Sequence, residues 1–236
     1  MLERLDYVKI VPHRILDAGS GPARDARALR RRYAGAQIFA LDFALPLLPR
    51  ASLLQRVLGQ APIAVCADMA RLPFAEQSFE LVWSNMALHW LNEPLAALRE
   101  FERALVPQGL LMFSTLGPDT LKELRAAAGA ARVHRFIDMH DVGDMLIAAG
   151  FSAPVMDMEL ITIDYRSSAA LLDDLRKSGQ TNARADRARS LSGRRLLEAL
   201  RAAPTRATYE VVYGHAWKRP PSDATVKTVR VFKSIS

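Results

Sequence analysis

Short apolar runs alternate with amphipathic segments through the first half of the chain, and this alternation constrains the fold more than any other feature. The runs expected to be strands cover residues 14–18, 37–42, 62–68, 79–85 and 109–115. The segments expected to be helices between them cover residues 23–33, 45–59 and 94–105. Regular alternation of this kind is typical of a parallel sheet whose crossover helices cover both faces. We therefore expect a doubly wound α/β fold.

The second half of the chain changes character. Helices are expected over 141–150 and 168–178, and strands over 155–165 and 208–218. Two late strands that flank a long helical excursion predict an antiparallel pair at the sheet edge. The expected architecture is a seven-stranded, mostly parallel sheet with a small C-terminal helical cap. The expected domain covers 1–219, its cap insertion 166–206, and a tail that is expected to be mobile 220–236.

Composition excludes several classes of protein. Half of the residues are hydrophobic and 24% are charged, which is ordinary for a globular protein. No apolar run approaches the roughly 18 residues that span a bilayer, and the N-terminus has no signal-peptide core, so we expect a cytoplasmic protein without membrane contact. The single cysteine, Cys66, excludes an internal disulfide, and its apolar surroundings predict a core position. The scattered histidines predict no metal site.

Positive charge is concentrated late in the chain. From Arg176 to Arg206 there are nine basic and two acidic residues, an excess of +7 that equals the net charge of the whole chain. Such a field indicates an acidic partner, although a solvated helical face would carry the same pattern. A nucleic acid is disfavoured as the partner because this stretch contains no aromatic residues on which bases could stack.

A glycine-containing loop, DAGSGPA over residues 17–23, joins the first expected strand to the first expected helix. Glycines there let the backbone approach a ligand at the positive end of a helix dipole, although any tight strand-to-helix turn also uses glycine. Arg24 stands where a dinucleotide-binding fingerprint would have its third glycine, which disfavours a dehydrogenase.

Two more acids follow the next two expected strands. Asp42 ends the second strand, where its carboxylate could accept hydrogen bonds from both hydroxyls of a ribose. Asp68 and Met69 close the third strand, where they could bind the amino group and cover the ring of an adenine. Acids at three successive strand ends are costly unless they bind something, so the pattern favours a nucleoside ligand.

Together these residues resemble the class I S-adenosylmethionine-dependent methyltransferases. The resemblance implies that S-adenosylmethionine is the cofactor, that S-adenosylhomocysteine is the product, and that no metal is required. It also implies that Asn85 presents a backbone group to the methionine amino group of the cofactor. The cofactor-binding residues that it implies are Asp17, Gly19, Gly21, Asp42, Phe43, Asp68, Met69 and Asn85.

Four later segments narrow the resemblance. Residues 84–90, 113–124, 135–141 and 208–217 are similar to the malonyl-acyl carrier protein O-methyltransferases of biotin synthesis. This implies methylation of the free malonyl carboxylate, with the acyl carrier protein docked on the basic stretch from Arg176 to Arg206. A carboxylate, with a reference pKa of about 4, is already ionised at neutral pH, so no general base is needed. The implied substrate contacts are His89, Trp90 and Arg135, with His140 and His215 as further possible anion contacts.

Two alternatives stay open. The related methyltransferase-like arginine hydroxylases that assist complex I assembly have similar segments. Family members also usually carry a longer N-terminal segment with an aromatic residue that closes over the methionine end of the cofactor, whereas 16 residues precede Asp17 here. Pro22 also removes an amide donor from the loop. The second alternative is therefore a cofactor-binding homologue that has lost activity.

Overall fold

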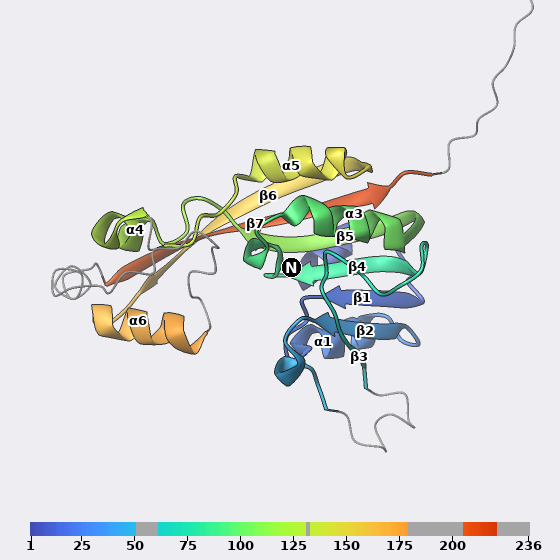
Figure 1. Cartoon of the computed structure of the whole chain (residues 1–236), viewed down its shortest axis with the longest axis horizontal. Coiled ribbons are helices and arrows are strands. Elements are labelled where there is room, and N and C mark those ends of the chain that lie inside the picture. Colours follow the sequence, from blue (N-terminus) through green and yellow to red (C-terminus); the bar gives the residue numbers. More distant parts are fainter. Residues whose placement is uncertain (51–60, 131–132, 179–204, 221–236) are drawn as a thin grey trace, which may run out of the picture.

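The computed structural model describes residues 1–50, 61–130, 133–178 and 205–220. Seven strands within these residues form one sheet in the order β3-β2-β1-β4-β5-β7-β6 (Figure 1). The strands are β1 (Arg14–Ala18), β2 (Gln37–Asp42), β3 (Ile63–Cys66), β4 (Phe79–Asn85), β5 (Leu105–Leu116), β6 (Phe151–Asp164) and β7 (Arg206–Lys218). β7 runs antiparallel to both of its neighbours, and the other pairs are parallel. The doubly wound sheet and its antiparallel edge pair are therefore confirmed.

Helices cover both faces of this sheet. They are α1 (Arg24–Arg32), α3 (Pro94–Ala104), α4 (Lys122–Ala128), α5 (Met139–Ala148) and α6 (Ser168–Lys177), with 3-10 turns η1 (Leu2–Tyr7), η2 (Leu45–Leu47) and η3 (Leu88–Trp90). α3 and α5 lie on one face and α1 on the other (Figure 1). The apolar pattern does not predict α4, η1 or η3, which are too short to show a full helical period.

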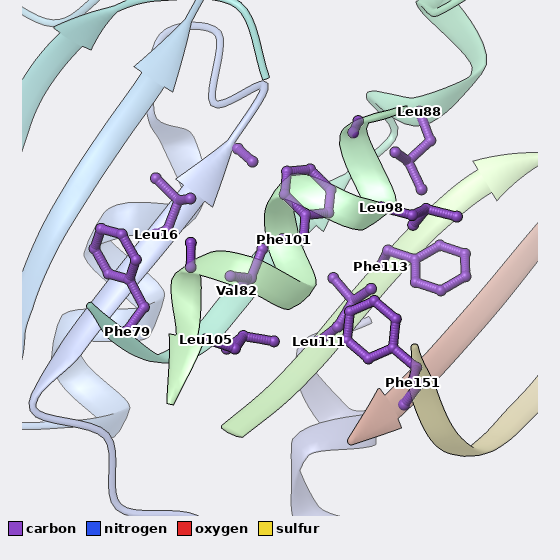
Figure 2. Packing of buried hydrophobic residues seen from close by; sticks show 14 of the residues in the cluster. Leu16, Phe79, Val82, Leu88, Leu98, Phe101, Leu105, Leu111, Phe113 and Phe151 are labelled. Carbon is purple, nitrogen blue, oxygen red and sulfur yellow. The ribbon is translucent and has the colours of Figure 1, made fainter. Parts of the chain in front are cut away.

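Neighbouring residues of one strand point into two separate apolar cores. Leu16 of β1 packs with Phe101 of α3 in the core shown in Figure 2. The preceding residue, Ile15, packs with Leu29 of α1 on the opposite face. Because side chains alternate along a strand, a strand covered on both faces reads as a continuous apolar run. This explains why the central strands could be recognised from sequence.

The helix expected over 45–59 is wrong in its first part, where the chain forms only the 3-10 turn η2. Leu48 takes an extended conformation with ψ of 141°. It precedes Pro49, and the proline ring disfavours a helical conformation in the residue before it. Residues 51–60 lie outside the described residues.

Three strands begin earlier than expected, and β7 does so by only two residues, at Arg206. β5 starts at Leu105, directly after α3, and the expected break at Gln108 is an irregularity within the strand with φ of +61°. β6 starts at Phe151 and contains a similar irregularity near Ala153, whose φ is +48°. Bulges of this kind absorb extra residues without ending the strand, so a pattern of alternation alone misreads them as breaks.

The expected core position of Cys66 is wrong, because its side chain is exposed. Cys66 ends β3, which lies at the edge of the sheet and pairs with β2 alone among the described strands. Ile63 of the same strand is 40% exposed. An apolar run at an edge is less covered than the same run in the centre of a sheet.

Most of the expected cap, residues 179–204, and the tail from 221 onward lie outside the described residues, so the division into domain, cap and tail stays a prediction. None of the described helices combines the length and the apolar character needed to cross a membrane.

Candidate functional site

The carboxyl ends of β1, β2 and β4 meet at one edge of the sheet and bring the predicted acids and the glycine loop together. Asp17 of β1 is in register with Ala40 of β2 and with Trp83 of β4. The backbone N–H of Ala67, after β3, donates to the Asp42 carbonyl at 3.2 Å. Adjacent parallel strands therefore place side chains from four segments around one crevice, where open α/β sheets bind ligands.

Two glycines shape the loop after β1. Gly19 has φ of +75°, and a Cβ built there would lie 2.3 Å from the Cβ of Ala87 and 3.1 Å from the Cε of Met69. Gly21 has φ of +52°, but its Cβ would meet no described atom within 4 Å. Gly19 is therefore required by both conformation and close packing, whereas Gly21 is required by conformation alone. Its open side leaves room for a ligand.

Asp42 is tied to this loop. Its Oδ2 accepts a hydrogen bond of 2.8 Å from the Gly21 N–H, and its Oδ1 accepts one of 2.8 Å from the Ala44 N–H. A carboxylate has about four acceptor sites, so both oxygens can still accept ligand hydroxyls. The next residue, Phe43, is 80% exposed and offers an apolar ring beside the carboxylate.

Asp17 is the most perturbed acid of the site. Its side chain is 2% exposed, and its Oδ2 has no hydrogen-bond partner among the described residues. Burial, followed by the negative charges of Asp25 and Asp42, raises the pKa of Asp17 to about 8. A buried acceptor without a partner is costly, so this atom fits a ligand that brings a donor or a positive charge.

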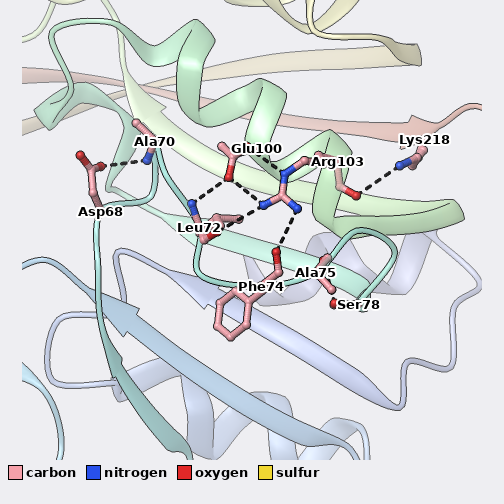
Figure 3. Close-up of polar contacts among 9 residues, drawn as sticks. All are labelled: Asp68, Ala70, Leu72, Phe74, Ala75, Ser78, Glu100, Arg103 and Lys218. Carbon is pink, nitrogen blue, oxygen red and sulfur yellow. Dashed lines mark hydrogen bonds and ion pairs between the residues drawn. The ribbon is translucent and has the colours of Figure 1, made fainter.

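The loop after β3 carries Asp68 and Met69. Asp68 is exposed, and its Oδ1 accepts a 2.8 Å hydrogen bond from the Ala70 N–H (Figure 3). Met69 is half-buried and approaches Gly19. The structure therefore places Met69 against the glycine loop and leaves one face of Asp68 open to solvent.

An ion pair on α3 holds this loop in place (Figure 3). Arg103 and Glu100 are 2.8 Å apart, and Glu100 accepts a 2.8 Å bond from the Leu72 N–H. Arg103 donates to the carbonyl oxygens of Leu72 and Phe74 at 3.3 and 2.9 Å. The loop position is thus fixed by α3 rather than by local turn chemistry alone.

Asn85 lies in a hydrogen-bond network that the sequence did not reveal. Its Nδ2 donates to Asp25 Oδ2 at 2.8 Å, and its Oδ1 accepts from Ser114 Oγ at 2.6 Å. Trp83 Nε1 donates to the same Asp25 oxygen at 2.9 Å. Asp25 lies in the first turn of α1, eight residues after Asp17. An acid at that place fits an ordinary helix start, so nothing marked it as part of the site.

His89 and Trp90 lie on η3, beyond the end of β4, with ring centroids 5.2 Å apart. His89 is 7% exposed, and neither of its ring nitrogens has a hydrogen-bond partner among the described residues. Its carbonyl oxygen accepts a 2.7 Å bond from His134 Nε2. Burial, with a smaller effect from His134, lowers the pKa of His89 to about 4. The His89 imidazole is therefore neutral at physiological pH.

Arg135 lies at the junction of two cavities. The first is a cleft of about 910 Å³ that it lines with Arg125, His134 and Asp141 among others. The second has a volume of about 30 Å³ and is lined by Arg135, His89 and Thr115 together with apolar residues. The Arg135 guanidinium is exposed and makes no ion pair or hydrogen bond with another described residue. It therefore keeps its charge available for an anion in the cleft.

The other two histidines that were predicted as anion contacts do not join this group. His140 is exposed at the start of α5, where its Nδ1 lies 2.7 Å from Asp138 Oδ1. His215 of β7 lines a separate cavity of about 340 Å³ with Arg4 and Tyr213. In the part of the chain that the structure describes, no group of three or more His, Cys, Asp or Glu side chains is arranged to hold a metal ion.

Comparisons with known proteins agree with this geometry. A family model described as a methyltransferase domain matches residues 16–113. The chain is 50% identical to the malonyl-[acyl-carrier protein] O-methyltransferase of Laribacter hongkongensis (strain HLHK9), over 92% of this chain and 80% of that relative. It is 48% identical to the malonyl-[acyl-carrier protein] O-methyltransferase of Methylovorus sp. (strain MP688), over 92% of this chain and 79% of that relative.

Solved structures share the fold. The YcgJ protein of Bacillus subtilis has a TM-score of 0.66 and 18% identity, covering 92% of this chain and 97% of that one. The phosphoethanolamine N-methyltransferase 2 of Haemonchus contortus, solved with S-adenosyl-L-methionine, has a TM-score of 0.56 and 20% identity, covering 92% of this chain and 51% of that one.

Proposed function

Because the chain belongs to the malonyl-[acyl-carrier protein] O-methyltransferase family, we propose that it methylates the free carboxylate of a malonyl group carried on acyl carrier protein. The names of these relatives do not favour the arginine hydroxylase alternative. The observation that carries the proposal is the 50% identity to the Laribacter hongkongensis relative, in a chain whose strand-end acids and glycine loop meet at one edge of the sheet.

S-adenosylmethionine, when bound, supplies an electrophilic methyl group on a sulfonium sulfur. A carboxylate oxygen forms the new O–CH₃ bond as the S–CH₃ bond breaks, and the electrons of that bond remain on sulfur. The products are therefore a methyl ester and the neutral thioether S-adenosylhomocysteine. No proton is transferred, so the reaction needs no base.

The residues present at the sheet edge fit this cofactor. The two Asp42 oxygens would accept the ribose hydroxyls, and Asp68 would accept the adenine amino group. Phe43 and Met69 would cover the purine ring, and the open side of Gly21 leaves room for the nucleoside. Asp17 Oδ2, which has no partner among the described residues, suits the methionine ammonium group, which a backbone group of Asn85 would also bind.

The chemistry of His89 supports a reaction without a general base. A pKa of about 4 makes its imidazole a poor proton acceptor at neutral pH. The contribution of the protein is then to align the carboxylate oxygen behind the sulfonium methyl and to exclude water. His89 and Trp90, both on η3, would form the wall against which the malonyl group is held.

Arg135 is our candidate for binding the substrate carboxylate. Its guanidinium has no described partner and lines both the large cleft and the small cavity beside His89. Guanidinium groups bind carboxylates through paired, charge-assisted hydrogen bonds. By contrast, Arg125 in the same cleft donates to the carbonyl oxygens of Pro118 and Thr120 at 2.7 and 2.8 Å. Arg135 therefore has the freer donors.

The carrier protein would dock on the basic stretch from Arg176 to Arg206. Its charge excess of +7 complements the acidic surface of acyl carrier proteins. Arg176, Lys177 and Arg206 flank the part of the stretch that lies outside the described residues. The support for this docking surface is therefore the charge pattern of the sequence.

Mass spectrometry of malonyl-acyl carrier protein, incubated with the chain and S-adenosylmethionine, tests the proposed function. We expect the malonyl group to gain one methyl group, and we expect this gain to be much slower with the Asp42→Ala variant at a limiting concentration of S-adenosylmethionine. An unchanged mass with folded, cofactor-binding protein would overturn the proposal and leave the inactive-homologue alternative. Oxygen added to a protein arginine would instead support the hydroxylase alternative.

A further inference from the structure

A carboxylate at the start of α1 connects three elements of the sheet edge. Asp25 Oδ2 accepts hydrogen bonds from Trp83 Nε1 at 2.9 Å and from Asn85 Nδ2 at 2.8 Å, and both donors belong to β4. Ser114 of β5 continues the network, donating to Asn85 Oδ1 at 2.6 Å and accepting from the Met86 N–H at 3.0 Å. The network therefore fixes α1, β4 and β5 relative to one another.

Asp25 accepts a hydrogen bond from the Trp83 indole N–H, a buried donor that would be costly to leave without an acceptor. The Trp83 side chain is fully buried, and an indole has one donor and no acceptor. The Asn85 side chain is engaged on both its amide and its carbonyl, so the network fixes its orientation at the end of β4. Asp25 thereby sets the position of the β4 end without itself needing to touch the ligand.

Asp25 also carries charge next to the cofactor site. Together with Asp17 and Asp42 it forms a group of three acids, and none of the three makes an ion pair with a described basic residue. The Asp17 carboxyl is 2% exposed, and its Oδ2 has no partner among the described residues. Burial is the largest cause of its raised pKa, and the negative charges of Asp25 and then Asp42 raise it further. A site of this kind favours the more positively charged of two otherwise similar ligands.

The methyl donor and its product differ by one positive charge, because the sulfonium becomes a neutral thioether. We propose that Asp25 is a positioning residue for the end of β4 and that its charge makes the site prefer S-adenosylmethionine over S-adenosylhomocysteine, which favours product release. This inference rests on the proposed function for its cofactor.

The test is the Asp25→Asn variant, which keeps an acceptor for Trp83 and Asn85 while removing the charge. Calorimetry on the full chain would measure the dissociation constants of both ligands. We expect S-adenosylmethionine to bind more weakly and S-adenosylhomocysteine to bind almost as before. The ratio of the two constants should shift by roughly fivefold, as for the loss of one nearby charge at partial screening. The matched control is Asp144→Asn, an exposed acid on α5, which should leave the ratio unchanged.

A purely structural role would weaken both ligands equally, and that result, or an unchanged ratio, would overturn the inference. A second variant, Ser114→Ala, breaks the network without changing charge and should not shift the ratio. These measurements need no acceptor substrate. The predicted shift in the ligand ratio can therefore be absent while malonyl-acyl carrier protein is methylated, or the reverse. A failure of this inference is thus distinguishable from a failure of the proposed function.

Discussion

The backbone N–H of Gly21 donates a 2.8 Å hydrogen bond to Asp42 Oδ2 and so joins the loop after β1 to the acid that ends β2. The Ala44 N–H binds the other oxygen at 2.8 Å. Asp42 therefore holds the glycine loop in addition to presenting its carboxylate at the sheet edge. Removing this side chain should affect loop geometry and ribose binding together.

The Asp42→Ala variant should lose at least about tenfold in affinity for S-adenosylhomocysteine, because charge-assisted hydrogen bonds contribute about 1.5 to 3 kcal/mol each. Calorimetry on protein with unchanged circular dichroism would measure the loss. Asp68→Ala should lose less, since its carboxylate is exposed and its hydrogen bond to Ala70 is local. An unchanged affinity in folded Asp42→Ala would show that the ribose lies elsewhere.

The two loop glycines give a matched pair of variants. Gly21→Ala introduces only left-handed backbone strain, about 1 to 2 kcal/mol, because its new Cβ meets no described atom. Gly19→Ala adds a clash with Ala87 to the same strain, so its thermal unfolding temperature should fall further. Equal losses in the two variants would contradict the close packing of Gly19 against Ala87.

Cofactor binding should release protons near pH 7. The pKa of Asp17 is about 8, so its carboxyl is mostly protonated in the free protein, and a nearby ligand ammonium would favour the ionised form. Calorimetry in two buffers of different ionisation enthalpy measures the number of protons released. We expect a release that approaches one proton in the parent chain and disappears in Asp17→Asn. The same release in both proteins would assign it to another group.

His89 should make the fold less stable in acid. Its pKa falls from 6.5 to about 4 on folding, so between these values the unfolded chain binds a proton that the folded chain does not. The stability of the parent relative to His89→Gln should therefore fall by up to about 3 kcal/mol as the pH drops from 6.5 to 4. Urea unfolding of both proteins at several pH values measures the His89 contribution to stability. The comparison separates it from the contribution of Asp17, which has the opposite sign and is the same in both proteins.

The same variant tests the mechanism. Because a carboxylate nucleophile needs no base, His89→Gln should lower the single-turnover rate by much less than the roughly hundredfold expected for a lost base. The rate should also show no rising limb between about pH 6 and 8. A rate that follows a pKa near 6.5 in the parent and vanishes in His89→Gln would reject the mechanism without a base.

Replacing Arg187, Arg194 and Arg195 with Glu should slow association with malonyl-acyl carrier protein, through the loss of electrostatic attraction. The defect should shrink as salt rises toward about 0.5 M, where the Debye length is a few ångström. Stopped-flow association rates would measure both effects. These variants should methylate malonyl-coenzyme A, which lacks the carrier protein, at nearly the parent rate.

A second triple variant separates docking from overall charge. Lys9, Arg27 and Arg31 are exposed and lie on or before α1, so replacing them with Glu makes the same change in net charge. Association with the carrier should slow much less in this protein. Equal slowing in the two triple variants would mean that net charge, rather than the basic stretch, attracts the carrier.

The grouping of Asp17, Asp42 and Asn85 could be predicted because the ends of adjacent parallel strands meet at one edge of the sheet, once the strands were recognised. Asp25 could not be predicted in the same way. Its contact with Trp83 depends on how α1 is rotated over β4, which apolar periodicity does not determine to within one side chain. The exposure of Cys66 was missed for a related reason, since an apolar run does not reveal whether its strand has one neighbour or two.

The order of the last strands has a consequence for how the chain is completed during synthesis. β6 leaves the ribosome before β7, yet among the described strands it pairs with β7 alone. Before β7 is made, one edge of β5 also lacks its partner. The carbonyl oxygens that end α3 then also lack the hydrogen bonds of 2.8 and 3.4 Å that Lys218 of β7 donates. A nascent chain that stops before β7 would therefore expose two unpaired strand edges at once, and such edges promote aggregation. We therefore expect the sheet to be completed only when β7 has been synthesised, after the half of the chain that carries the proposed cofactor site.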